Sequence, residues 1–188
     1  MMIPILIDGP AVEPVTLADM RAHLRLDHEA EDELVAGLVK AARLMVEAAS
    51  RRVLVEQRWR LVLDRWPRDR VLVLPLAPVI AVDRVLVTDA RGIAGELAPE
   101  TYDADLLSDP PRLAVAPSVP DPGRERRGIA VEVRAGFGPS PEDVPAPLRL
   151  ALKMMVARWY ENRGDLTGAQ DLPPDALALV APFARPRL

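Results

Sequence analysis

The chain has 188 residues, 49% of them apolar, and a formal net charge of −4 at pH 7. This length suffices for one domain, or one domain with an appendage, and the negative charge gives no sign of a protein that binds nucleic acid over its whole surface. Because the chain contains no cysteine, disulfides and thiolate metal sites are excluded.

The first residues, MMIPILIDGP, are apolar but lack a basic flank and are too short for a signal peptide or a membrane span. We therefore expect a soluble, cytoplasmic protein without a membrane partner, in which residues 1–15 form an extended lead-in. Thr16 and Asp19 have the spacing of a capping box, which predicts a short helix from Thr16 onward.

Proline divides the rest of the chain. Of the twenty prolines, none lies in residues 17–65 or 149–172, and thirteen lie in residues 67–147. Proline is costly inside a helix, so the two gaps are where long helices can run. The proline-rich middle predicts strands and turns.

Residues 27–51 are predicted to form one long helix, capped by Asp27 and with acidic first turns that suit the helix dipole. Its apolar residues form two neighbouring rows at helical spacing: Leu34, Leu38, Ala41, Met45 and Ala48 in one, and Val35, Val39, Ala42, Val46 and Ala49 in the other. The opposite side carries Glu33, Lys40, Arg43, Glu47 and Arg51. So wide an apolar face can pack on the chain's own core with one row and on a neighbour with the other. The alternative is that both rows are buried within one chain.

After Arg52 the hydrophobic period changes from 3.6 to 2, which indicates strands. We expect short antiparallel strands, folded as a small sandwich or barrel, in residues 58–66, 71–74, 79–88, 102–106, 112–115 and 129–134. Residues 89–92 look like a hairpin tip.

Pro145 and Pro147 suit the first turn of a C-terminal helix. Its apolar side, formed by Leu148, Leu152, Met155 and Trp159, is the natural partner of the long helix. The last stretch is proline-rich and mostly irregular, with one turn of helix at residues 175–180. The predicted fold class is α+β, with a helical layer, an inserted β unit and an extended tail, divided at residues 1–52, 53–143, 144–164 and 165–188.

No catalytic constellation is recognisable in the sequence, so we expect neither an enzyme nor a cofactor. His23 and His28 lie on either side of a predicted helix break, so a metal site from this pair is disfavoured. Arg124, Arg126 and Arg127 form a basic loop that can contact nucleic acid, although Asp121 and Glu125 offset its charge. A nucleic-acid-binding module that uses residues 124–127 is therefore the alternative to an assembly protein.

Five segments in a fixed order resemble the head–tail connector (adaptor) family of long-tailed bacteriophages, prophages and gene transfer agents. They are PVTLADMRAHLRLD (residues 14–27), EDELVAGLVKAARLMVEAASRRVLVEQRW (31–59), LPLAPVIAVDRV (74–85), VEVRAGFG (131–138) and VPAPLRLALKMMVARWYENRGD (144–165). The closing ALVAPFARPRL also looks like the tail of this family.

The resemblance implies a ring, usually of twelve subunits, seated below the portal protein at the DNA exit of the capsid. Such a ring joins the portal to the next tail component, a stopper or tail terminator, and DNA passes through its lumen without sequence-specific binding. The chain would then occur in the bacterial cytoplasm during assembly and afterwards at the head–tail junction of a phage-like particle.

Three groups of residues become candidate contacts under this resemblance. The C-terminal segment is expected to dock on the portal through Leu179, Pro182, Phe183, Arg185, Arg187 and Leu188. DNA passes most freely along a wall that does not attract it, so the candidate lumen or rim residues are Glu29, Glu31, Asp32 and Glu33. The candidate subunit interface comprises Val35, Val39 and Val46.

Overall fold

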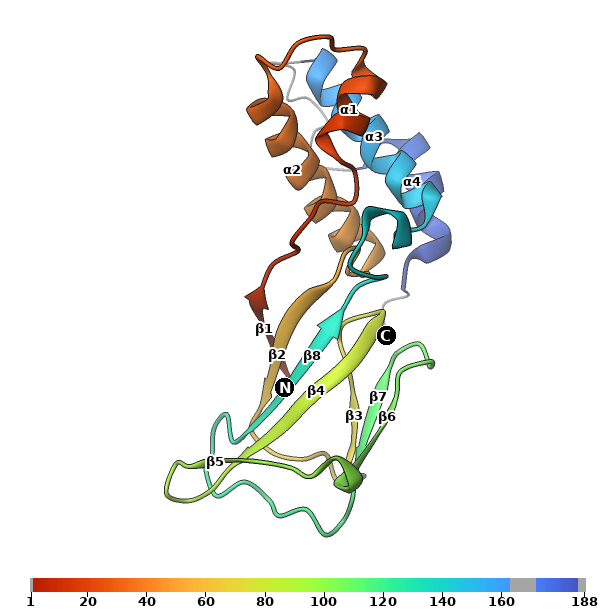
Figure 1. The fold of residues 1–188 in the computed structure, drawn as a ribbon. Helices are drawn as coiled ribbons and strands as arrows, with labels where there is room; N and C mark the ends of the chain where they lie inside the picture. Colours follow the sequence, from red (N-terminus) through yellow and green to blue (C-terminus); the bar gives the residue numbers. More distant parts are fainter. Residues whose placement is uncertain (1, 163–171, 186–188) are drawn as a thin grey trace. The chain divides into compact units, whose positions relative to one another are not determined.

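The computed structural model describes residues 2–162 and 172–185, and the chain divides into two compact units (Figure 1). One unit, here called the β unit, combines Met1–Gly9 with Glu56–Gly136. The other, the helical unit, combines Pro10–Val55 with Phe137–Leu188. The α+β class predicted from the sequence is confirmed.

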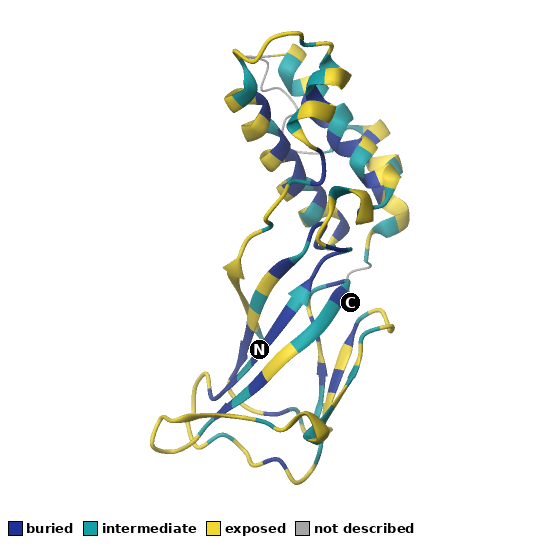
Figure 2. Cartoon of the chain, viewed as in Figure 1, coloured by how far each residue is buried: buried dark blue, intermediate teal, exposed yellow. Residues whose placement is uncertain are grey.

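The helical unit is built around its third helix. Its helices are α1 (Leu17–Leu24), α2 (Asp32–Ser50), α3 (Ala146–Glu161) and α4 (Pro174–Val180), with 3-10 turns at Pro141–Asp143 and Ala181–Phe183. α3 packs against α2 on one side and against α4 on the other. The predicted partnership of α2 and α3 is confirmed, because the buried side chains of both helices share one hydrophobic core (Figure 2).

The boundary between α1 and α2 differs from the prediction. The hydroxyl of Thr16 caps α1 by accepting a hydrogen bond of 3.0 Å from the N–H of Asp19, as its spacing predicted. The long helix, however, starts at Asp32 rather than at Asp27, and its N-cap position is Glu31. Arg25 adopts a left-handed conformation that ends α1, and the chain needs the following residues to reverse direction before α2.

A buried arginine ties α2 to the segments on either side of it. Sequence periodicity placed Arg43 on the solvent side, but its side chain is almost fully buried. Its Nε donates to Glu13 at 2.7 Å and its Nη1 donates to Glu47 at 2.9 Å. The other oxygen of Glu47 accepts the N–H of Leu54 at 2.9 Å. Burial alone lowers the pKa of Arg43, but its bonds with Glu13 and Glu47 outweigh this effect, so the pKa is raised and the guanidinium stays charged.

The β unit is a sandwich of two antiparallel sheets. The strands are β1 (Ile3–Asp8), β2 (Gln57–Leu63), β3 (Val71–Val73), β4 (Val79–Thr88), β5 (Ala94–Glu96), β6 (Tyr102–Asp105), β7 (Arg112–Val115) and β8 (Ile129–Ala135). One sheet has the order β1-β2-β8-β4-β5 and the other β3-β7-β6, so both are open and do not close into a barrel. Alternate residues of both sheets, such as Leu61, Val131 and Leu113, form the core between them.

The first strand was not predicted. The sequence predicts an extended lead-in over residues 1–15, whereas in the structure β1 pairs antiparallel with β2 and forms an edge of the larger sheet. Proline fits into a sheet only where its missing N–H is not needed for pairing, which is the free side of an edge strand, and Pro4 lies in this edge strand.

The C-terminal segment folds back on its own unit instead of extending from it. The predicted turn of helix at residues 175–180 is present as α4, and its Ala176 and Val180 are buried in the helical core. Arg52 Nε donates to the carbonyl of Phe183 at 2.9 Å, and the N–H of Arg185 donates to the carbonyl of Ser50 at 3.1 Å. Residues up to 185 are therefore part of the fold.

Replacing Arg43 with methionine should destabilise the helical unit by about 2 kcal/mol, because two neighbouring carboxylates lose their buried cation. Urea unfolding followed by circular dichroism at 222 nm measures this change. Lys40→Met on the exposed side of the same helix is the matched control and should change the free energy of unfolding by less than about 0.5 kcal/mol. Adding Glu13→Gln to the Arg43→Met variant should recover part of the loss; equal stability of Arg43→Met and the control would refute the role of the buried arginine.

Candidate interaction surfaces

The helix α2 is apolar on two opposite faces. Its inner face contains Val35, Val39 and Val46, which are buried in the core of the chain itself. These three valines, the candidate subunit interface, therefore offer no surface to another subunit. The face that points away from the core carries Leu34, Gly37, Ala41, Leu44 and Ala48, all of them exposed. Of the other predicted row, Leu34, Ala41 and Ala48 are exposed, whereas Leu38 and Met45 are partly buried against the core. The face of α2 that can still meet a neighbour is therefore shifted towards Gly37 and Leu44.

The candidate portal-binding residues have different surroundings. Leu179 and Phe183 are partly buried against the helical core, so their side chains serve first to attach α4. Pro182 is exposed, and Arg185 is half-buried near the end of α2. Arg187 and Leu188 lie outside the described residues. The part of this set that is available to a partner is thus smaller than the sequence suggested.

Two residues of the helical unit hold most of the acidic cluster in place. Arg21 pairs with Glu29 at 2.9 Å and with Asp32 at 3.2 Å. Glu31 accepts a hydrogen bond from the hydroxyl of Tyr160. Three of the four carboxylates therefore have partners within the chain, and the fourth, Glu33, is exposed at the start of α2.

The basic loop of the β unit is folded against its neighbours. The N–H of Arg127 donates to Asp64 at 2.8 Å, and the N–H of Gly123 donates to the carbonyl of Thr88 at 2.9 Å. A Cβ at Gly123 would lie 2.2 Å from the backbone nitrogen of Ala90, so the loop packs tightly on the β4–β5 hairpin. A hollow of about 320 Å³ beside it is lined by both arginines and carboxylates, so it does not form a uniformly positive site.

The edge strand β1 presents a second apolar surface. All six of its residues are exposed, among them Ile3, Ile5, Leu6 and Ile7. A patch of exposed aliphatic side chains on one strand is typical of a surface that another molecule covers in an assembly.

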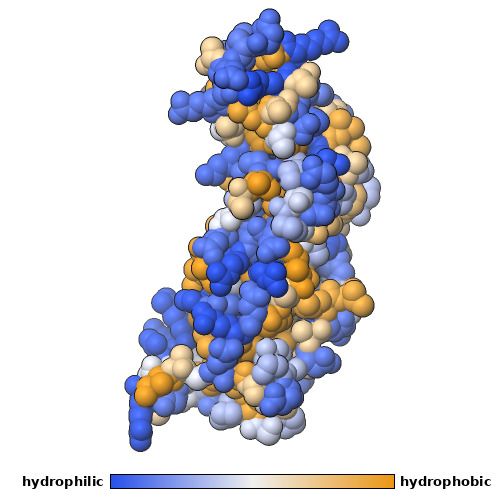
Figure 3. Space-filling view, viewed as in Figure 1, coloured by the Kyte–Doolittle hydropathy of each residue, from blue (hydrophilic) through white to orange (hydrophobic). Residues whose placement is uncertain are grey.

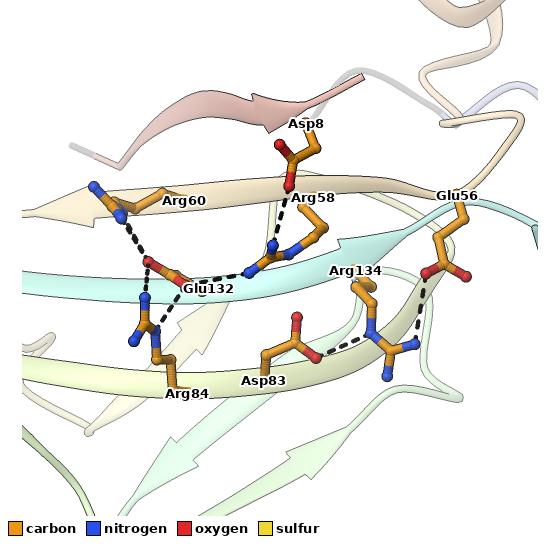
Figure 4. A network of polar contacts seen from close by, with 8 residues as sticks. All are labelled: Asp8, Glu56, Arg58, Arg60, Asp83, Arg84, Glu132 and Arg134. Carbon is orange, nitrogen blue, oxygen red and sulfur yellow. Dashed lines mark hydrogen bonds and ion pairs between the residues drawn. The ribbon is translucent and has the colours of Figure 1, made fainter. Parts of the chain in front are cut away.

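The largest polar network lies on the outer face of the five-stranded sheet (Figure 4). Glu132 occupies the central strand β8, directly opposite Arg60 on β2 and Arg84 on β4. Its carboxylate accepts from Arg60 Nη2 at 2.7 Å and from Arg84 Nε at 2.8 Å, with Arg58 3.9 Å away. Glu132 is only 1% exposed, whereas the three arginines are about half exposed.

This network is suited to structure rather than to catalysis. Hydrogen bonds from Arg84 and Arg60 lower the pKa of Glu132 even though burial opposes this shift. A carboxylate with a lowered pKa is a poor general acid or base near neutral pH, because proton transfer is most effective when the pKa of the acid or base lies near the working pH. Opposite charges placed directly across neighbouring strands stabilise a sheet and fix its register.

Within residues 2–162 and 172–185, no three histidine or acidic side chains come together in a way that could hold a metal ion. In the same part of the chain, none of the helices has both the length and the apolar composition needed to cross a membrane.

Comparison with known proteins identifies relatives among solved particle structures. A chain from the neck of an empty GTA particle determined with C6 symmetry is 29% identical, with a TM-score of 0.77, and the match covers 98% of this chain and 97% of the other. A chain from the neck of a native GTA particle determined with C12 symmetry is 28% identical, with a TM-score of 0.76 and coverage of 98% and 97%. A chain from the virion of a native gene transfer agent (GTA) particle is 25% identical, with a TM-score of 0.81 and coverage of 99% and 97%.

No family model matches the sequence, and no curated protein does. The matched structures confirm the resemblance to the head–tail connector family. They also support a structural role in the neck of a particle, at the head–tail junction, because the matched chains are components of virions.

Removing the arginine partners of Glu132 should cost more stability than removing the whole network. The double variant Arg60→Ala/Arg84→Ala leaves a buried carboxylate with only Arg58 nearby, which should cost on the order of 2–3 kcal/mol. Adding Glu132→Gln to this variant should recover most of the loss. Thermal and denaturant unfolding of the three proteins measures the difference, and a triple variant less stable than the double would contradict the proposed network.

The same carboxylate predicts a pH dependence. Its pKa in the folded protein lies below the ordinary value of 4.5, so its stabilising effect is complete above that pH and is lost as the pH falls through the lowered pKa. The stability difference between the native protein and Glu132→Gln should therefore be constant near neutral pH and should shrink below about pH 4.5.

Proposed function

We propose that this chain is a head–tail connector: its copies form a ring in the neck of a phage-like particle and join the head to the tail. The observation that carries the proposal is the match along 98% of the chain, through both units, to chains from GTA necks. A match confined to one unit would support only a shared domain, whereas a match along both supports a shared role.

The symmetry of the related necks supports a cyclic arrangement. Those necks were determined with C6 and C12 symmetry, and twelve copies is the number that the family resemblance implies. A cyclic ring uses a heterologous interface, in which one patch of each copy contacts a different patch of the next. The exposed apolar surfaces on α2 and β1 are available for such contacts.

The acidic end of the helical unit is proposed as the lumen or rim of the ring. An acidic wall repels passing DNA weakly. Binding of DNA to a basic wall would release counterions, and this release would favour retention of the DNA. Glu33 is its most available carboxylate, because the other three are bonded within the chain. A map of the neck that placed Glu33 on the outer wall of the ring would contradict this assignment.

Portal binding is proposed for the end of the chain, through Pro182, Arg185 and the residues after 185. An arginine can pair with a carboxylate of the portal through two parallel hydrogen bonds. Repetition around a ring turns individually weak contacts into strong attachment. The other ring face would then meet the next tail component.

Deleting the gene in cells that produce the particles tests the role. The expected result is DNA-filled heads and free tails that do not join, as seen by electron microscopy, with joining restored by the native gene. Complementation with Arg124→Ala/Arg126→Ala/Arg127→Ala should also restore joining, because the basic loop is not part of the proposed role. Joined, infective or transducing particles without the gene would refute the proposal.

Two truncations test portal binding. Removal of residues 186–188 should leave thermal melting nearly unchanged but weaken binding to portal-bearing heads by at least about tenfold. Removal of residues 181–188 should in addition lower the stability by about 1–2 kcal/mol, because Phe183 leaves the helical core. Undiminished binding of the first variant to the heads would show that the end of the chain is not the anchor.

A further inference from the structure

Two helices of the helical unit, α2 and α4, each have an exposed apolar face, and the two faces are formed by different residues. α2 and α4 both pack on α3, and each has a second face that points away from it. The outer face of α2, defined above by Leu34, Gly37, Ala41, Leu44 and Ala48, contains no charged residue. A helix that is apolar on all but its flanks is ordinarily covered on both sides.

The outer face of α4 has the same character. Residues 174–183 read PDALALVAPF and contain one charged side chain, Asp175. Its inner side is formed by Ala176, Leu179, Val180 and Phe183, which contact the helical core. Its outer side is formed by Pro174, Leu177, Ala178 and Ala181, and all four are exposed. Figure 3 shows orange and pale atoms along the edge of the helical unit where α4 lies in Figure 1.

The two faces suit each other in shape and charge. On α2, Leu34 is 42% exposed and Leu44 is 52% exposed, and on α4 Leu177 is 50% exposed, so both faces present large aliphatic side chains among small residues. Apart from its chain neighbours and the backbone of its own helix, nothing in residues 2–162 and 172–185 lies within 4 Å of the place that a Cβ would occupy at Gly37, so another helix can approach α2 closely there. Of the two exposed charges beside the α2 face, Glu33 and Lys40, the lysine is opposite in sign to Asp175, the exposed charge of α4.

We propose that the outer face of α2 in one copy docks on the outer face of α4 in the next copy. The proposal rests on the ring described under Proposed function and names the surfaces that close it. A contact between two different patches on opposite sides of a subunit propagates from copy to copy, as a cyclic ring requires. Pairing of α2 with α2 would instead close at a dimer.

The free edge of β1 is a weaker candidate for this contact. Strand addition needs a row of backbone donors and acceptors, and Pro4, the second residue of β1, has no N–H to donate. Its opposite edge in the same sheet, β5, is only three residues long.

Cysteine cross-linking tests the proposal directly, because the native chain contains no cysteine. The full-length variant Ala41→Cys/Ala178→Cys should give a ladder of covalent oligomers when particles that carry it are oxidised or treated with a short bismaleimide. Either single variant should remain monomeric, and Ala41→Cys/Ala90→Cys, with its second cysteine on the β unit, should give no ladder. Dimers from Ala41→Cys alone, or no ladder from the paired variant, would overturn the proposed docking.

Two substitutions that each introduce a negative charge provide an independent test. Leu44→Glu and Leu177→Glu replace exposed side chains, so both proteins should keep the native melting temperature while their incorporation into necks falls at least tenfold. Leu150→Glu, which changes an exposed leucine of α3 outside both faces, is the matched control and should lose far less. Normal incorporation of both Leu44→Glu and Leu177→Glu would overturn the docking while leaving the connector role intact, whereas absence of the native chain from necks would overturn the role itself.

Discussion

The helical unit depends on the burial of α3 between helices that come from opposite ends of the sequence. Leu148, Leu152 and Met155 are fully buried, and they contact a core to which both α2 and α4 contribute. Apolar area removed from water is the main stabilising term in such a core. Because α2 lies before residues 56–136 of the β unit and α4 lies after them, this core forms only when the two segments of the helical unit meet.

The same long-range organisation applies to the β unit. Its larger sheet takes an edge strand from residues 3–8 and all its other strands from beyond residue 56. Each unit also contains a buried charge whose partners are distant in sequence: Glu13 lies 30 residues from Arg43, and Arg60 lies 72 residues from Glu132. Buried ion pairs of this kind add little net stability compared with apolar packing, but they penalise any arrangement in which the partners do not meet.

Local patterns predicted the parts of the fold that are local. Hydrophobic period, proline distribution and the Thr16 cap identified α1, α3 and most of the strands. The predicted start of α2 was wrong because a run of acidic residues resembles the first turn of a helix, where negative charge suits the dipole. Glu29 instead lies in the loop before α2 and pairs with Arg21 of α1. β1 was missed because its only strand partner lies some fifty residues away and its apolar residues do not alternate with polar ones. The inward row of α2 and the docking of α4 also depend on tertiary contacts, so the sequence could indicate two apolar rows but not which of them remains exposed.

Pro4 also bears on the tendency of the edge strand β1 to aggregate. Ile3, Ile5 and Ile7 are exposed on an edge strand, which is the composition of a segment that nucleates fibrils. Fibril growth requires an uninterrupted ladder of backbone hydrogen bonds, and a proline within six residues breaks that ladder. The strand can therefore keep an apolar surface for side-chain packing while its backbone disfavours amyloid-like stacking.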